Sequence, residues 1–365
     1  MIKLEKMIRI RIIMFFVLLI AFNSCKSTKT TSSKNDVVKS DQISRITNKA
    51  PYNPKPGMQE LRDENEKKGS DGKVKLKKPI HFLVFGDSKG SKHLKSVLEI
   101  ADKLNPQFCL TTADLVNKGG GDIGEKLYND LDKDAGWFFR KYPTWPTLGN
   151  HEVGGPKSNT GQENYDSGVK NFGDFFGLKD PLYSFTYGNA KFIALDWIKV
   201  SNSPERLEWL EKELIEAQGM HIFVFKHRPY YTVGHKSYKD VAGKSTIVTE
   251  LFSKYKVDAV FSGHDHIYHR TLRDGVNYIV SAGAGATIYD LKRERDAISG
   301  DAYYGRTRDM DSEEFKFHPA TGKEVFFNKP MFFVVSVKVD GGKVTFEMID
   351  TNGKTWDKFT YKSDF

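Results

Sequence analysis

Five strand-like segments of this chain are each followed, within two to five residues, by side chains suited to binding a metal ion. The segments are residues 80–85, 107–112, 144–148, 221–225 and 257–261. The polar residues that follow them are, in order, Asp87, Asp114, Asn150 with His151, His227, and His264 with His266. Ligands commonly bind where the carboxyl ends of parallel strands meet at one edge of a sheet. The pattern therefore favours an α/β fold in which these residues converge at such an edge.

Helices are predicted between the strands, and antiparallel hairpins in two places. Residues 91–104 carry an apolar stripe at helical spacing, and further helices are expected from about residue 124, from residue 203 and over 246–255. Hairpins are indicated around Gly188-Asn189 and around Asp340-Gly341-Gly342. This combination predicts two packed sheets flanked by helices. Residues 289–330 are polar and aromatic without periodicity, so they either border an active site or form a long surface loop.

The N-terminal end is predicted to be an export signal with a lipid attachment site. Residues 1–24 have a basic start and an apolar run that is short for a membrane span, which is typical of a secretory signal. Cys25 and the Lys-, Ser- and Thr-rich stretch after it resemble a bacterial lipoprotein junction, although Phe22 departs from the usual small aliphatic residue. We expect a location in the cell envelope, on the periplasmic or cell-surface face of a membrane. The alternative is an uncleaved N-terminal anchor.

Residues 25–78 are predicted to be a flexible basic tether, and residues 79–365 a single catalytic domain. The tether has few apolar residues with which to offset its chain entropy. The whole chain has a formal net charge of +9, but residues 79–365 carry 38 Lys and Arg against 39 Asp and Glu. The basic excess therefore belongs to the signal and the tether. It is no argument for nucleic-acid binding, and a basic tether beside an anionic membrane is the simpler account.

The residue types at the strand ends favour a site for two metal ions. Carboxylate oxygens and imidazole nitrogens suit hard-to-borderline divalent ions. His264 and His266 are two positions apart and project to the same side, so each can bind a different ion, and Asp114 can bridge two ions about 3.5–4 Å apart. Cysteine does not contribute, because Cys109 lies in an apolar strand and is expected to be a small buried side chain.

Together these motifs resemble the calcineurin-like metallophosphoesterase family over about residues 79–350. The run 226–230 (Lys-His-Arg-Pro-Tyr) and the helix near residue 205 are most similar to the purple-acid-phosphatase branch. The resemblance implies a four-layer α/β/β/α sandwich of two mixed sheets flanked by helices. It also implies two divalent ions (Mn, Fe or Zn) at the sheet edges. The carrying motifs are Gly86-Asp87, Asp114 with its trailing glycines, Gly149-Asn150-His151-Glu152, His227 and Gly263-His264-Asp265-His266.

The resemblance also implies a role for each residue. A metal-bound hydroxide would attack phosphorus in line, and His151 would protonate or steady the leaving group, while Glu152 would either orient the site or be a plain loop carboxylate. The implied ligands of one ion are Asp87, Asp114 and His266, and those of the other are Asp114, Asn150, His227 and His264.

Two positions depart from the family pattern. Lys89 stands where many members have a histidine, and Asn117 stands where purple acid phosphatases have a tyrosine ligand. The first metal site is therefore expected to have a thin ligand set. Three outcomes are open: Lys89 points away and a second ion binds, Lys89 contacts the substrate phosphate, or the enzyme works with one tightly held ion.

The predicted activity is hydrolysis of small-molecule phosphomonoesters by an exported, membrane-tethered enzyme. A phosphodiesterase on the same site is the first alternative, and a binding lipoprotein with weak catalysis is the second. Lys89, Asn117 and Tyr231 are the candidate substrate-binding residues. A nucleic-acid partner is not expected, because the folded part carries no basic excess.

Overall fold

The strands that precede the candidate ligands lie in two mixed sheets. The computed structural model describes residues 54–154, 162–195, 203–235, 246–307 and 314–363. The six-stranded sheet has the order β17-β16-β15-β3-β4-β5, in which β3, β4 and β5 run parallel. Its strands are β3 (Ile80–Phe85), β4 (Phe108–Thr111), β5 (Thr144–Pro146), β15 (Phe333–Asp340), β16 (Lys343–Asp350) and β17 (Thr355–Lys362).

The nine-stranded sheet has the order β14-β13-β12-β10-β11-β9-β8-β7-β6. Strands β7, β8, β9 and β11 run parallel, and the others join as antiparallel neighbours. Its strands are β6 (Tyr183–Tyr187), β7 (Ala190–Ala194), β8 (His221–Phe225), β9 (Ala259–Ser262), β10 (Tyr268–Arg273), β11 (Val276–Ser281), β12 (Ala302–Arg306), β13 (Phe315–His318) and β14 (Val325–Phe327).

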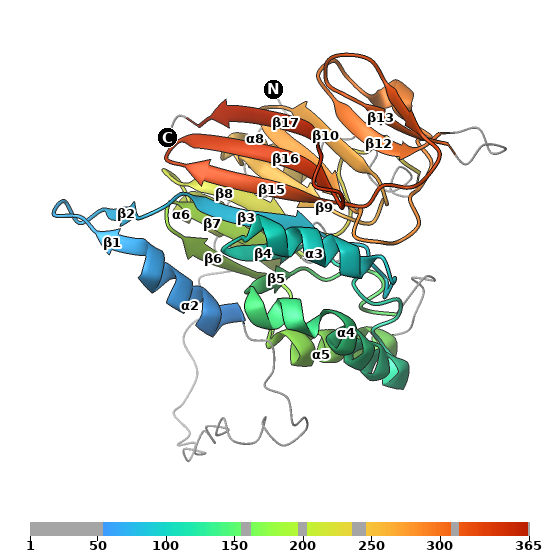
Figure 1. The fold of residues 1–365 in the computed structure, drawn as a ribbon. Helices are drawn as coiled ribbons and strands as arrows, with labels where there is room; N and C mark the ends of the chain where they lie inside the picture. The colour runs from blue at the N-terminus through green and yellow to red at the C-terminus, as the bar shows by residue number, and fades with distance from the viewer. Residues whose placement is uncertain (1–53, 155–161, 196–202, 236–245, 308–313, 364–365) are drawn as a thin grey trace, which may run out of the picture. The chain divides into compact units, whose positions relative to one another are not determined.

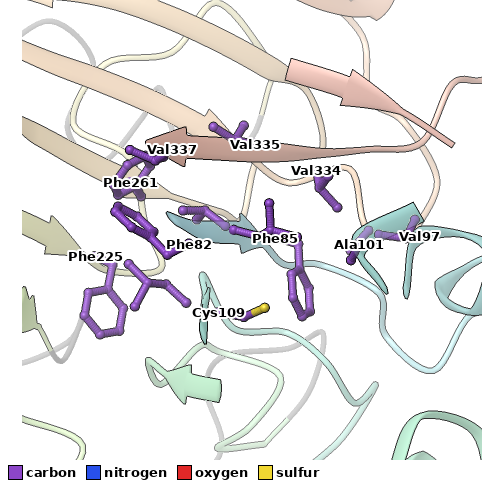
Figure 2. Close-up of a cluster of buried hydrophobic side chains, with 14 of the residues drawn as sticks. Phe82, Phe85, Val97, Ala101, Cys109, Phe225, Phe261, Val334, Val335 and Val337 are labelled. Carbon is purple, nitrogen blue, oxygen red and sulfur yellow. The ribbon is translucent and has the colours of Figure 1, made fainter. Parts of the chain in front are cut away.

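The two sheets pack face to face through aromatic side chains. Phe82 of β3 makes edge contacts with Phe192, Phe223 and Phe261 of the other sheet, with ring centroids 5.2, 5.3 and 6.1 Å away. Successive residues of a strand point to opposite faces, so each neighbouring position can serve the outer layer. Phe82 lies with Phe261 and Val337 in Figure 2, whereas the ring centroid of Phe85 is 6.1 Å from that of Phe138, which belongs to a helix. The alternation lets each strand contribute to two apolar layers at once.

Helices cover both outer faces, so the predicted four-layer α/β/β/α fold is confirmed. In Figure 1, α3 lies across the six-stranded sheet, and α4 contacts both α3 and α5. On the other sheet, Leu210 of α6 and Phe252 of α8 pack with Val224 and Val260 in a second apolar cluster. The helices are α3 (Leu94–Leu104), α4 (Gly121–Lys141), α5 (Gln162–Phe176), α6 (Pro204–Glu216) and α8 (Ile247–Lys254).

Residues 54–78, nearly half of the segment 25–78 that the sequence predicts to be a flexible tether, form regular secondary structure, so that prediction does not hold for them. Residues 54–78 include α2 (Pro54–Asn65) and the paired strands β1 (Glu66–Lys68) and β2 (Val74–Leu76). Met58 is buried in the main apolar cluster, which compensates for the entropy of ordering this polar segment. By its contacts, the compact unit covers residues 51–365.

Residues 289–330, left open by the sequence, extend the nine-stranded sheet instead of forming one long loop. The segment contains a short 3₁₀ helix (Glu294–Asp296) and the strands β12, β13 and β14. Figure 1 shows β12 and β13 at the upper right, beyond the six-stranded sheet. Within the described ranges, no helix has both the length and the apolar character needed to cross a membrane. The predicted signal and Cys25 lie outside those ranges.

Candidate metal centre

Three side chains from separate loops place possible ligand atoms within 4.8 Å of one another: Asp114, His227 and His264. Nε2 of His227 lies 3.3 Å from Oδ1 of Asp114 and 3.1 Å from Nδ1 of His264. Asn150 completes the group, because its Oδ1 lies 3.0 Å from Nε2 of His227 and 2.8 Å from Nδ1 of His264. Carboxylate, amide and imidazole donors suit Mn, Fe and Zn. The donor set therefore fits the metal that the sequence predicts, although ligation stays a prediction.

Hydrogen bonds to backbone carbonyls orient two of the imidazoles. Nδ1 of His227 donates to the carbonyl of Thr112 at 2.8 Å, and Nδ1 of His266 donates to that of Thr287 at 2.7 Å. With Nδ1 carrying the hydrogen, Nε2 keeps its lone pair for another partner. Fixing a ring through its second nitrogen is the usual arrangement for metal-binding histidines. Both rings are thus prepared to present Nε2 as a ligand atom.

The loops that carry these residues have an unusual backbone conformation. Left-handed φ values are uncommon for residues with a Cβ and cluster at functional sites. The loops after β3 and β4 hold each other, since the N–H of Asp87 donates to the carbonyl of Ala113 at 2.8 Å. Five of the eight described non-glycine residues with positive φ belong to this site: Asp87, Lys89, Ala113, Asp114 and His264.

Burial and mutual contact shift the pKa values of the group. Burial alone would raise the pKa of Asp114, but the imidazoles of His227 and His151 outweigh it and hold that pKa below its usual range. Burial lowers the pKa of His264 well below the ordinary value, and the neighbouring His227 adds to the effect. A neutral imidazole is the form that binds a metal ion. The electrostatics therefore keep His264 ready to act as a ligand.

Glu152 orients the β4 loop and is not a plain loop carboxylate. Its Oε2 accepts hydrogen bonds from the backbone N–H of Asp114 at 2.9 Å and of Gly149 at 3.0 Å. Its Oε1 accepts one from the N–H of Leu115 at 2.9 Å. Burial, and next the carboxylate of Asp114, raise the pKa of Glu152 to about 8. The side chain thus ties two ligand-bearing loops together behind the site.

Asp87 and His266 lie beside this group without joining it. Both carboxylate oxygens of Asp87 lie 3.0 Å from the backbone nitrogen of His264, and Oδ1 lies 3.4 Å from Nε2 of His266. Within the described part of the chain, Nε2 of His266 and Oδ2 of Asp114 are buried without a hydrogen-bond partner. Such orphaned atoms call for an explanation, and an ion is one. The ammonium of Lys89 lies 3.6 Å from that same Oδ2 of Asp114.

A cavity of about 920 Å³ opens beside Lys89 and His266 and provides room for a substrate. Nδ1 of His151 donates to the carbonyl of Asn117 at 2.6 Å, so Asn117 contributes its backbone oxygen to the site. The ring of Tyr289 stacks on His266 with centroids 3.9 Å apart. The polar and aromatic residues lining the cavity include Lys89, Lys92, His93, Asn117, His151, His266, Tyr289, Arg306 and Phe332. Residues 289–330 therefore do border the cavity, which is one of the two readings that the sequence allows.

The structure places one predicted substrate contact away from the cavity, and several lining residues give no clear signal in the sequence. Tyr231 packs against Tyr278 in the second apolar cluster, with ring centroids 4.7 Å apart, and it does not line the cavity. Conversely, His93, which stacks on Phe332 at 4.5 Å, gave no signal in the sequence beyond its place between a strand and a helix. A second cavity of about 890 Å³ near Trp356 touches none of the predicted site residues.

Known phosphatases are similar to this chain in sequence. Purple acid phosphatase 15 of Arabidopsis thaliana is 30% identical over 138 residues, which cover 36% of this chain and 26% of the relative. Serine/threonine-protein phosphatase CPPED1 of Danio rerio is 27% identical over 214 residues, covering 54% of this chain and 66% of the relative. The matches thus span from about a quarter to about two thirds of the length of these relatives.

Solved structures show the same fold. A purple acid phosphatase from yellow lupin (Lupinus luteus) seeds has a TM-score of 0.56 at 17% identity, covering 82% of this chain and 59% of that one. GAP50, described as the anchor in the inner membrane complex of Plasmodium, has a TM-score of 0.51 at 15% identity, covering 78% and 89%. The sequence pattern of the calcineurin-like phosphoesterases matches residues 80–268, just over half of the chain. With its fold and the order of its site residues, this shows that the chain belongs to the calcineurin-like phosphoesterase family.

Proposed function

We propose that this protein is a metal-dependent phosphoesterase that hydrolyses small phosphomonoesters. The observation that carries the proposal is the group of Asp114, His227 and His264, whose possible ligand atoms lie within 4.8 Å of one another close to a cavity. A divalent ion bound there would neutralise charge on the phosphate and make water more acidic. Asn150 supplies a further oxygen to the same group.

His151 is positioned to give a proton to the leaving group. Its Nδ1 is engaged by the carbonyl of Asn117, so Nε2 is the atom left for acid–base chemistry. Nε2 lies 3.8 Å from Oδ2 of Asp114, and the ring lines the cavity. Burial lowers the pKa of His151, while the carboxylate of Asp114 acts in the opposite direction. A histidine whose Nε2 is protonated in the substrate complex can pass that proton to the leaving group.

The preference for monoesters rests on the relatives, which are named as phosphatases. A phosphodiesterase on the same site is the competing assignment, since a metal site of this kind can serve either ester. To separate them, a chromogenic phosphomonoester and its bis-ester are assayed side by side after chelation and after return of Mn²⁺ or Zn²⁺. The monoester should turn over faster, and only with metal. Faster turnover of the bis-ester would reverse the assignment.

The His264→Ala variant tests the metal group directly. Loss of one ligand should lower the turnover by at least about 100-fold. His318→Ala is the matched control, because His318 lies on β13 and pairs with Glu324 away from the group. Unchanged turnover in His264→Ala would show that this group does not carry the activity. Absence of turnover by the wild-type protein on every phosphoester tested would favour a binding protein that retains the fold.

We further propose that the protein is exported and held on a membrane by a lipid on Cys25. The support is the signal-like composition of residues 1–24 and the lipoprotein-like junction after it. Replacing Cys25 by Ser should move the protein from the membrane fraction to the soluble fraction, with loss of incorporated fatty acid. Retention in the membrane fraction without fatty acid would favour an uncleaved anchor instead.

A further inference from the structure

Lys89 reaches the metal centre from a loop whose backbone is tightly held. Its φ is 50°, a left-handed value, and its N–H donates to the carbonyl of Asp114 at 2.8 Å. The next residue, Gly90, donates to the carbonyl of Leu115 at 2.9 Å. The Lys89 side chain is only 15% exposed. Lys89 is therefore a positioned internal cation, unlike a lysine on a freely moving surface loop.

The ammonium and the metal group lie on different oxygens of the same carboxylate. Oδ1 of Asp114 lies 3.3 Å from Nε2 of His227, inside the metal group, and it accepts the backbone N–H of His151 at 3.0 Å. Oδ2 has no hydrogen-bond partner within the described residues, and the Lys89 ammonium lies 3.6 Å from it. An ionised carboxylate has two oxygens and can face a cation with each of them. Here the second cation next to Asp114 is the lysine.

The remaining donors on that side would have to hold an ion beside the ammonium of Lys89, which lies 3.6 Å from Oδ2 of Asp114. Asp87 and His266 are the other candidates, and they do not join the group of possible ligand atoms around Asp114. A protonated lysine offers three hydrogens and no lone pair, so it cannot be a ligand. A fixed positive charge at this distance also opposes a divalent ion on the same carboxylate oxygen.

We infer that the ammonium of Lys89 takes the place of a second metal ion, so that this protein holds one divalent ion tightly between Asp114, Asn150, His227 and His264. The inference deepens the proposed function and rests on it. Lys89 also lines the cavity together with His151 and His266. Its ammonium therefore faces the space for the substrate, where it acts as a point charge on one phosphate oxygen. The bound ion faces another oxygen.

Metal counting tests the inference without using activity. The purified protein is equilibrated with Mn²⁺, dialysed, and examined by elemental analysis, titration calorimetry and electron paramagnetic resonance. The wild-type protein should retain about one ion per chain, with the spectrum of an isolated Mn²⁺. Lys89→His replaces the charge with a neutral nitrogen ligand. It should raise the tight stoichiometry to about two and give the spectrum of a spin-coupled pair.

Two further variants keep the test decisive. Lys89→Met removes the charge without adding a ligand, so the affinity for a second ion should rise by at least about tenfold while the first is unchanged. It should also weaken inhibition by inorganic phosphate by about tenfold or more. Lys95→His is the matched control, because Lys95 is exposed on α3, and its metal count should stay at that of the wild type. Thermal melts confirm that each variant is folded.

The outcomes separate the inference from the proposed function. Two ions bound with similar affinity by the wild-type protein would overturn the inference and leave a phosphoesterase intact. A count that stays at one in both Lys89→His and Lys89→Met would also overturn it, because the lysine would then not be what limits the site. If the protein binds one ion tightly but hydrolyses no phosphoester, the proposed function is refuted. The inference that Lys89 takes the place of a second ion is then unaffected.

Discussion

The carboxylate of Glu152 accepts a hydrogen bond from the backbone N–H of Asp114, with 2.9 Å between nitrogen and oxygen. The same carboxylate accepts the N–H groups of Leu115 and Gly149 at 2.9 and 3.0 Å. One buried side chain thus connects the loop after β4, which carries Asp114, to the loop after β5, which carries Asn150. The geometry of the metal group thus depends on a residue that is not one of its possible ligands.

Replacing Glu152 by Gln should destabilise the protein and weaken metal binding together. Three backbone donors would face a side chain that has one acceptor oxygen and an NH₂ group. Leaving buried donors unsatisfied costs about 1–3 kcal/mol each, so the free energy of unfolding should fall by roughly 2–4 kcal/mol. Chemical denaturation and Zn²⁺ titration measure the two effects. Glu125→Gln, at an exposed position of α4, is the control and should change neither.

Replacing Gly263 by Ala should disrupt the approach between two loops. A Cβ at Gly263 would lie 2.3 Å from Oδ2 of Asp87 and 2.7 Å from the carbonyl oxygen of Thr112. The first atom belongs to a candidate ligand and the second to backbone, so relief requires both loops to move. We expect a loss of about 1–3 kcal/mol in stability, together with weaker metal binding. Wild-type metal affinity in this variant, measured by calorimetry, would show that the close approach is not needed.

The His151→Asn variant should discriminate between leaving groups. A general acid matters most when the departing oxygen is a poor leaving group, and such catalysis contributes about 10²–10⁴-fold. Turnover of an alkyl phosphate should therefore fall by at least about 100-fold, and that of 4-nitrophenyl phosphate by much less. Metal content should be unchanged, because His151 lies outside the group of possible ligand atoms. Equal losses on both substrates would argue against a proton-donating role.

Stability should depend on pH through His81, which lies on β3 and does not belong to the metal group. Burial, and next the charge of Lys338, lower the pKa of His81 from 6.5 to about 4. Between those values the unfolded chain binds more protons than the folded one, so stability falls as the pH drops from 6.5 to 4. This shift corresponds to roughly 2–3 kcal/mol.

The His81→Gln variant tests this assignment. Gln keeps a hydrogen-bonding group for the Oγ of Ser336, which lies 3.0 Å from Nε2 of His81, and it does not titrate. Relative to this variant, the metal-free wild type should lose stability as the pH falls through this range. Parallel pH profiles of the unfolding free energy for the two proteins would show that His81 does not carry the effect.

Much of the site could be predicted from the sequence because its residues follow strands that are recognisable as short apolar segments. Asp87, Asp114 and His227 each come directly after a short apolar segment, and the carboxyl ends of parallel strands meet at one sheet edge. Other elements gave weaker signals. The strand β17 alternates charged and aromatic residues at the sheet edge, and α5 contains two glycines, so the sequence predicts neither element. The polar composition of residues 54–78 concealed α2, which is ordered by burying Met58.

The sequence was sufficient for the identity and order of the candidate ligands, since residue type dictates which metals can bind and strand spacing dictates where ligands stand. It could not decide where Lys89 points or what Glu152 holds. Those contacts depend on left-handed backbone in the loops and on distances between segments far apart in the chain. Asp114 lies 38 residues from Glu152, and only folding brings that carboxylate to its N–H. For the same reason, only the tertiary structure places Tyr231 in an apolar cluster and the Lys89 ammonium beside Asp114.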